Sequence, residues 1–378
     1  MYLTLRLTLK PNKEQERLLR QFSGGARFCY NEALSYWNNW YENYNGSPSL
    51  QDLLSHLQDL KYNYDEYKWL QNIPITIQNQ SCRDLINAFK KYFKGVSRRP
   101  KFKKKNRCRD SFYQRIDKFR VVNNTHVKIT GIKQPVKIGK NNRDALLVLQ
   151  DCKFYNPRVV FDGKHWFINL SVEVNCCDSH GDQSTGVDMG VRKLATLSDG
   201  TMYQGLHKDT RIIKLESRLK RLQRIVSRKY EANKQGNRYI KTNNIKKLER
   251  KIRLIHKCIR DIRTTYLHTI SMEIVSKSKA ICIEDLNISG MMKNKHLSRL
   301  IQLQGLYTLR QFITYKAEFY GADLYIADRY YPSSKLCSCC GNKKNYLGAD
   351  ETYICSNCGA VIDRDLNAAK NLQALIPA

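Results

Sequence analysis

Acidic residues are scarce in this chain, which has 34 Asp and Glu against 66 Lys and Arg among its 378 residues. The formal net charge of +32 makes the chain repel itself unless a polyanion neutralises it. Nucleic acid is therefore the expected partner, and a small-molecule substrate is not.

The sequence also lacks an apolar run of the roughly 18 residues that a membrane-spanning helix needs, and it lacks a lipidation signal. We therefore expect no membrane partner. Residues 1–10 alternate between apolar and polar side chains, which predicts a strand rather than a signal peptide. These features together favour a cytoplasmic protein.

Hydrophobic periodicity divides the chain into helical and β-rich parts. Residues 11–109 predict helices, the last over Ile75–Phe93, followed by a basic arm. Short β-rich runs at residues 110–181, one of them at 146–149, predict a small antiparallel sheet or barrel that the first strand is free to join. After a polar boundary segment, residues 182–378 predict a hairpin, a long helical pair at 208–270 and two further strands. The expected fold class is α+β with several domains.

Two stretches concentrate the positive charge. Eleven of the twenty residues at 90–109 are Lys or Arg and none is acidic. The helical pair carries twenty basic residues against five acidic ones between Lys208 and Arg263. Such stretches are commonly solvated faces or arms, but in a chain this basic we favour contact with phosphates. The candidate nucleic-acid contacts are Gln80 and Arg83 on the polar side of the helix at 75–93, and Arg99, Lys101, Lys103, Lys104 and Lys105 in the arm.

Four cysteines have the spacing of a zinc site. Cys337-x-x-Cys340-Gly and Cys355-x-x-Cys358-Gly are two knuckles, each closed by a glycine where the chain must turn around an ion. Four thiolates saturate Zn²⁺, so the metal would be structural. Two disulfides are the alternative, which the spacing disfavours. Cys339 is left out of the ligand set because the residue after it is not glycine.

A second group of metal-binding residue types, Cys176-Cys177-x-x-His180, lacks the paired spacing and is interpreted as part of a linker.

Acidic residues stand at the ends of three predicted elements. Asp188 lies in a strand of the hairpin, Glu284 ends a later apolar strand, and Asp363 and Asp365 precede the last helix. Two Mg²⁺ ions about 4 Å apart, held by several carboxylates, would clamp a phosphodiester and activate water. Acids at strand ends also serve as caps, so spacing alone does not decide between a metal site and capping residues. Only one of Asp363 and Asp365 can readily join the metal site, and the other can cap the helix.

Motifs along the whole chain resemble TnpB, the RNA-guided nuclease of insertion-sequence transposons, which is similar to the small type V CRISPR effectors. In the second half they are Gly186-Val-Asp-Met-Gly190, Ile283-Glu-Asp-Leu-Asn287, Arg329-Tyr-Tyr-Pro-Ser-Ser-Lys-Leu-Cys337 and Asp363-Arg-Asp-Leu-Asn-Ala-Ala369. In the first half they are Leu9-Lys-Pro11, Gly25-Ala-Arg27 with Tyr30-Asn31, and Arg99-Pro-Lys-Phe-Lys-Lys-Lys105.

The resemblance implies a RuvC nuclease domain of RNase H-like fold at residues 182–378, with a zinc ribbon at 335–360 inserted before its last helix. It implies a β-barrel formed by residues 1–10 and 110–181 and split by a helical recognition domain at 11–109. It places the catalytic, Mg²⁺-binding acids at Asp188, Glu284 and Asp365. The implied partners are a guide RNA from the transposon end and double-stranded DNA with a short flanking motif.

Two other functions remain as alternatives. A guide-bound repressor that binds DNA without cutting would need a broken acidic triad, and all three acids are present. A transposase acting directly on transposon ends would need strand-joining chemistry, for which the sequence shows no catalytic tyrosine with a paired histidine metal motif.

Overall fold

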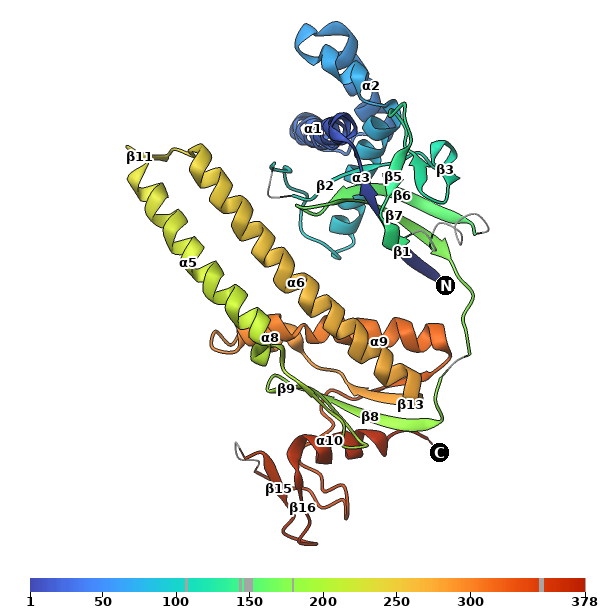
Figure 1. The fold of residues 1–378 in the computed structure, drawn as a ribbon, viewed down its shortest axis with the longest axis vertical. Helices are drawn as coiled ribbons and strands as arrows, with labels where there is room; N and C mark the ends of the chain where they lie inside the picture. Colours follow the sequence, from blue (N-terminus) through green and yellow to red (C-terminus); the bar gives the residue numbers. More distant parts are fainter. Residues whose placement is uncertain (106–107, 143–144, 146–151, 179, 347–349, 378) are drawn as a thin grey trace. The chain divides into compact units, whose positions relative to one another are not determined.

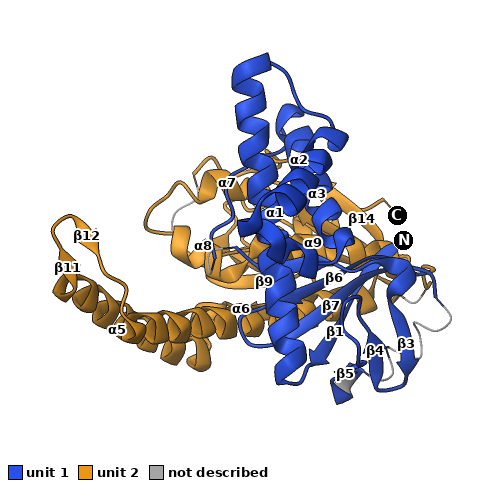
Figure 2. Ribbon diagram, turned by 90° about the horizontal axis from the view of Figure 1, so that it is seen from above, with its two compact units in different colours: residues 1–174 blue, residues 175–378 orange. Residues whose placement is uncertain are grey.

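The computed structural model describes residues 1–378 except 106–107, 143–144, 146–151, 179, 347–349 and 378. The chain divides into two units, residues 1–174 and residues 175–378 (Figure 2). Both combine helices with sheets, which confirms the α+β multidomain class. The β-rich run predicted at residues 146–149 lies outside the described residues. Within the described part, no helix has the length and apolar character required to cross a membrane.

Unit 1 is built on an antiparallel sheet with the strand order β2-β6-β7-β1-β5-β4-β3. The first strand of the chain is central in it, because β1 pairs with β7 on one side and β5 on the other. The alternation seen in the sequence buries Leu7 and Leu9 in the core, as predicted. The strands are β1 (Tyr2–Lys10), β2 (Asp110–Tyr113), β3 (Arg120–Asn123), β4 (His126–Lys128), β5 (Val136–Ile138), β6 (Phe154–Phe161) and β7 (Trp166–Glu173).

The predicted closed barrel is not found among the described strands. The ladder ends at β2 and β3, and no pairing between described residues joins these two edges. Both edge strands are only four residues long, which leaves little backbone for a closing ladder. In the described residues this part of the chain is an open sheet.

Between β1 and β2 come α1 (Lys13–Tyr44), α2 (Leu50–Asn63), the 3₁₀ segment η1 (Asp65–Asn72) and α3 (Ile75–Phe93). Residues of α1 and α3 pack against the sheet, and α2 and η1 pack against these two helices. A capping box starts α1, with the Asn12 side chain accepting from the Gln15 amide and the Gln15 side chain accepting from the Asn12 amide. The helix predicted at 75–93 has those bounds in the structure. Leu85 and Phe89 of its apolar face are buried, and Phe89 stacks on Trp37 with ring centroids 4.1 Å apart.

Unit 2 contains a mixed sheet with the strand order β10-β9-β8-β13-β14 (Figure 1). The predicted hairpin is present as antiparallel β8 and β9, while β13 runs parallel to β8 and β14 parallel to β13. The carboxyl ends of β8, β13 and β14 therefore share one edge of the sheet. The strands are β8 (Gln183–Met189), β9 (Lys193–Leu197), β10 (Met202–Gln204), β13 (Ser278–Glu284) and β14 (Asp323–Ala327).

The predicted basic helical pair is α5 (Thr210–Ala232) and α6 (Asn243–Lys277), preceded by η4 (Leu206–Lys208). The polar break between the helices is a short hairpin, β11 (Lys234–Gln235) and β12 (Arg238–Tyr239). After β13 come α7 (Ile288–Met291), α8 (Ser298–Gln304) and α9 (Leu306–Tyr320), and α9 packs on α6. The chain ends with the hairpin β15 (Thr352–Ile354) and β16 (Val361–Asp363) and with α10 (Arg364–Gln373), which packs on β8.

Candidate active site

Asp188 and Glu284 lie on neighbouring parallel strands at the same edge of the unit 2 sheet. Val187 of β8 is directly opposite Ile283 of β13, so the acid that follows each of them stands at the same level. Glu284 is the last residue of β13, and Asp188 is the penultimate residue of β8. Both side chains are only partly exposed.

Asp365 comes to this edge on α10, and Asp363 has a different role. The Asp363 side chain accepts hydrogen bonds from the amides of Asp365 and Leu366, at 3.0 and 3.1 Å, and caps the helix. The prediction that one of the two acids is a cap is therefore confirmed. Lys193 bridges the pair, with its Nζ 2.7 Å from Asp363 Oδ2 and 3.3 Å from Asp365 Oδ2.

The three acids share one electrostatic environment. Burial raises the pKa of Asp188 well above its usual range, and the negative charges of Glu284 and Asp365 raise it further. The positive charges of Arg364 and Lys193 oppose that rise. Burial also raises the pKa of Glu284, and a hydrogen bond from the Ser333 hydroxyl opposes it. The structure therefore brings together the three acids that the sequence singled out.

These donors fit a hard divalent cation. The negative charges of Glu284 and Asp365, which raise the pKa of Asp188, would be offset by a cation between the carboxylates, and Mg²⁺ prefers oxygen ligands. Thr196, directly opposite Asp188 on β9, has a buried hydroxyl for which the described residues provide no hydrogen-bond partner. The carboxylate oxygens of the three acids are farther apart than the cysteine sulfurs described below. Those four sulfurs all lie within 4.8 Å of one another.

Two further contacts hold the end of β13 in place, and sequence reasoning missed both. The buried Ser333 donates its hydroxyl hydrogen bond to Glu284 Oε1. Asp285 forms ion pairs with Arg310 of α9 at 2.6 Å and with Arg329 after β14 at 2.5 Å. Ser333, Asp285 and Arg329 lie inside motifs quoted for the family resemblance, which was the available signal for them, whereas Arg310 lies outside those motifs.

Gly186 allows α10 to lie directly on β8. A Cβ atom at this position would stand 1.9 Å from the carbonyl oxygen of Ala369 and 2.5 Å from the amide nitrogen of Gln373. Both are backbone atoms of α10, so a side chain would displace the helix that carries Asp365. The glycine two residues before Asp188 is thus needed for close approach rather than for a turn.

Gly186→Ala is expected to lower the free energy of unfolding by about 1–3 kcal/mol or more, because the added methyl overpacks a helix–strand contact. Urea unfolding of the purified protein measures this. Gly24→Ala is the matched control, since a Cβ there would meet nothing closer than 3.9 Å and the helix α1 favours alanine. Equal midpoints for both variants and the parent protein would contradict the assigned packing role.

The four predicted cysteine ligands converge. Cys337 and Cys358 have sulfurs 3.6 Å apart, as do Cys340 and Cys355, which is far beyond the length of a disulfide bond. Gly341 and Gly359 follow the knuckles with φ of 73° and 71°, a left-handed conformation that forms the turn predicted at each glycine. Four clustered thiols fit tetrahedral Zn²⁺, and the exposed Cys339 lies outside the group.

The cysteine cluster is tied to α10 by a buried asparagine. Asn367 accepts from the Ser338 amide at 2.9 Å and donates to the Leu336 carbonyl at 2.6 Å. Asn371, one turn later, donates to the carbonyls of Ser333 and Leu336 at 2.7 and 2.8 Å. The loop around the first knuckle is therefore fastened to the helix that carries Asp365.

The basic arm is anchored to α1. The Asn31 side chain accepts from the Lys103 amide at 2.7 Å and donates to the Lys103 carbonyl at 3.0 Å. The Lys103 ammonium lies 3.5 Å from the centre of the Tyr30 ring. Burial lowers the pKa of Lys103, and the nearby Asp84 carboxylate opposes that change. Lys103 therefore has structural contacts of its own, and contact with phosphate stays a prediction for it.

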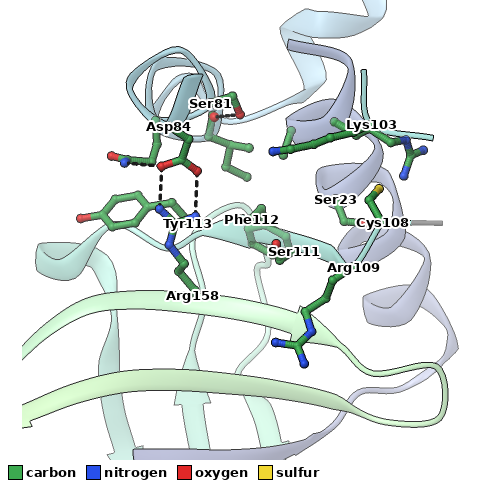
Figure 3. A pocket seen from close by; sticks show the side chains of 14 residues that line it. Ser23, Ser81, Asp84, Lys103, Cys108, Arg109, Ser111, Phe112, Tyr113 and Arg158 are labelled. Atoms are coloured by element: carbon green, nitrogen blue, oxygen red, sulfur yellow. Dashed lines mark hydrogen bonds and ion pairs between the residues drawn. The ribbon is translucent and has the colours of Figure 1, made fainter. Parts of the chain in front are cut away.

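Figure 3 shows the polar pocket beside this anchor, with Asp84 and Arg158 facing each other. The two form a bidentate ion pair at 2.7 and 2.8 Å, and Gln80 donates to Asp84 at 3.0 Å. The remaining candidate contacts are exposed: Arg83, Arg99, Lys101, Lys104 and Lys105. Among these, Arg99 donates to the Asn38 side chain at 3.0 Å.

Comparison with known proteins gives three matching family models: "Helix-turn-helix domain" at residues 1–46, "Probable transposase" of the IS605 OrfB type at 167–295, and "Cas12f1-like, TNB domain" at 307–372. The first of these spans β1 and α1 in the structure, a strand and one long helix. The "Putative RNA-guided DNA endonuclease InsQ" of Escherichia coli K12 is 31% identical, over 97% of this chain and 90% of that protein. The chain belongs to the TnpB family.

Other similar proteins agree with this TnpB membership. A "Putative RNA-guided DNA endonuclease" of Streptomyces pristinaespiralis is 30% identical, over 96% of this chain and 87% of that protein. The chain also resembles the protein in a cryo-EM structure of a Cas12f1–sgRNA–target DNA complex, with a TM-score of 0.61 and 16% identity. That match covers 96% of this chain and 83% of the other, and it concerns the fold alone.

Proposed function

We propose that this TnpB-family protein is an RNA-guided DNA endonuclease encoded by a transposon. The observation that carries the proposal is the meeting of Asp188, Glu284 and Asp365 at one edge of the unit 2 sheet. The names of the two relatives described above support the same activity. In this proposal residues 182–378 form a RuvC-type domain of RNase H-like fold, with a zinc ribbon at residues 335–360.

The three carboxylates would hold two Mg²⁺ ions, which activate the attacking water and stabilise the leaving oxygen of the phosphodiester. The chain itself supplies orientation. Ser333 fixes the Glu284 carboxylate by donating to Oε1, and Lys193 holds Asp365 beside Asp363. The partly buried positions of Asp188 and Glu284 limit the access of bulk water to the acids.

The remaining domains would handle the nucleic acids. We assign residues 1–10 and 110–181 to a β-domain, residues 11–109 to a helical recognition domain, and the basic pair within residues 208–270 to nucleic-acid contact. The net charge of +32 supports a large polyanionic partner. A guide RNA from the transposon end would select the DNA by base pairing, while the protein recognises a short flanking motif. The predicted cytoplasmic location stays a prediction.

The deciding experiment is to purify the protein with the RNA transcribed from its own locus and to sequence that RNA. The complex is then given Mg²⁺ and a plasmid library that carries the guide-matched target next to randomised bases. We expect cleavage that depends on the guide and on one flanking motif. Guide-dependent binding without cleavage would favour the repressor, and strand joining at transposon ends would favour a transposase.

A further inference from the structure

A groove opens beside Asp365, and its lining includes neither Asp188 nor Glu284. It has a volume of about 370 Å³ and is formed by the β8–β9 turn, β10, η4, the residues before β15 and the start of α10. Asp365 belongs both to the acidic group and to the wall of this groove. A DNA strand with one phosphate at the acids can therefore continue into the groove.

Cationic side chains predominate in the groove: Arg192, Lys193, Lys208 and Arg364 face three acids, one of which is Asp365 itself. The two inner cations act on the acidic group, since Lys193 bridges Asp363 and Asp365 and the charge of Arg364 opposes the rise in the pKa of Asp188. The two outer cations, Arg192 and Lys208, are exposed to solvent.

The outer cations have weak partners that a phosphate can replace. Arg192 pairs with Glu351 at 2.9 Å, but the two side chains are 71% and 70% exposed, and ion pairs of this kind contribute about 0–1 kcal/mol. Lys208 donates to the neutral side chain of Gln204 at 3.2 Å. A phosphate oxygen offers each of them a stronger, charge-assisted hydrogen bond.

We propose that Arg192 and Lys208 bind a backbone phosphate next to the scissile one, on the DNA strand that is being cut. This proposal rests on the nuclease function proposed above and adds a phosphate-binding subsite to it. Contacts of this kind fix the register of a strand without reading its bases, so the subsite is independent of DNA sequence. It aligns the scissile phosphate with the three acids by holding its neighbour.

The test uses guide-matched DNA in which single phosphates around the cut are replaced, one at a time, by uncharged methylphosphonates. For the parent complex, one position flanking the cut is expected to slow single-turnover cleavage by roughly tenfold, because a charge-assisted contact is lost. The double variant Arg192→Gln/Lys208→Gln should cut unmodified DNA more slowly by a similar factor. The methylphosphonate at that position should then cause no further loss.

The control is the double variant Lys277→Gln/Lys279→Gln, which removes two exposed cations outside the groove and outside residues 208–270 and should retain the positional effect. The proposal is overturned if the methylphosphonate slows the Arg192→Gln/Lys208→Gln variant as much as it slows the parent complex. It is also overturned if no methylphosphonate position slows the parent complex.

A second measurement does not depend on cleavage. A photoreactive benzoylphenylalanine in place of the groove residue Val191 should crosslink to the DNA strand that is being cut, and the same group in place of the exposed Asp323, at the opposite end of the parallel strands, should not. Crosslinking at Val191 without cleavage by any complex would keep the subsite and reject the nuclease function. Cleavage without crosslinking at Val191 would reject the subsite alone.

Discussion

Asp188→Asn is expected to reduce guide-dependent DNA cleavage by about a thousandfold or more while the protein still binds its guide RNA. Metal ions held by carboxylates supply several kcal/mol of transition-state stabilisation, and each 1.4 kcal/mol or so is a factor of ten in rate. Asparagine keeps the shape of the side chain but removes the charge. Single-turnover cleavage and RNA retention, measured on the same preparation, test both parts of the expectation.

The same substitution should leave the protein at least as stable without Mg²⁺. Burial and the charges of Glu284 and Asp365 disfavour the ionised form of Asp188, so removing its charge relieves repulsion. Asp323→Asn is the control, because Asp323 is exposed at the opposite end of the parallel strands. Undiminished cleavage by the Asp188 variant would refute the assigned site, and a large loss of thermal stability would instead indicate a structural carboxylate.

Cys355→Ser is expected to abolish zinc binding and to reduce DNA cleavage by at least about a hundredfold, although the cysteine does not contact the substrate in our proposal. Structural zinc sites contribute directly to folding, so the β15–β16 hairpin should open without the metal. That hairpin ends at Asp363, and Asp365 follows two residues later. Zinc content by elemental analysis, limited proteolysis and cleavage assays test this expectation.

Cys339→Ser provides the matched comparison, since it removes an exposed neighbouring thiol that lies outside the four-sulfur group. It should retain one zinc ion per chain and normal activity. Unchanged resistance to protease after verified removal of zinc would count against a folding role for the metal. Loss of zinc with full cleavage activity would separate the ribbon from the acidic site.

Local sequence patterns predicted those parts of the structure that local physics determines. The alternation in residues 1–10 gave a strand, the helical periodicity of Ile75–Phe93 gave a helix with the same bounds, and the cysteine spacing gave the converging sulfurs. The meeting of Asp188 and Glu284 was harder, because the two acids are joined only by the parallel pairing of β8 with β13. At the level of sequence, only the family resemblance predicted that these acids belong to one site.

Other features depend on contacts that no single stretch encodes. The described strands do not form the closed barrel, since β-rich runs indicate strands but not whether the two strands at the edges of the sheet, here β2 and β3, pair with each other. Lys103 looked like one basic residue among many, yet its backbone is held by Asn31 and its ammonium lies over Tyr30. Gly186 is explained only once α10 is in place, because the atoms that exclude a side chain there belong to that helix.

The direct connection between the cysteine cluster and α10 also determines where insertions and deletions can occur in this region during evolution. From Cys358 to Asp365 the chain passes through β16 and directly into the helix, so an inserted residue would shift Asp365 relative to Asp188. The fourteen residues between Cys340 and Cys355 include Asn345, Tyr346 and Asp350, which are exposed and lie outside the described strands, so this segment can change in length more easily. Insertions and deletions among homologues should therefore accumulate between the two cysteine pairs and be rare after the second pair.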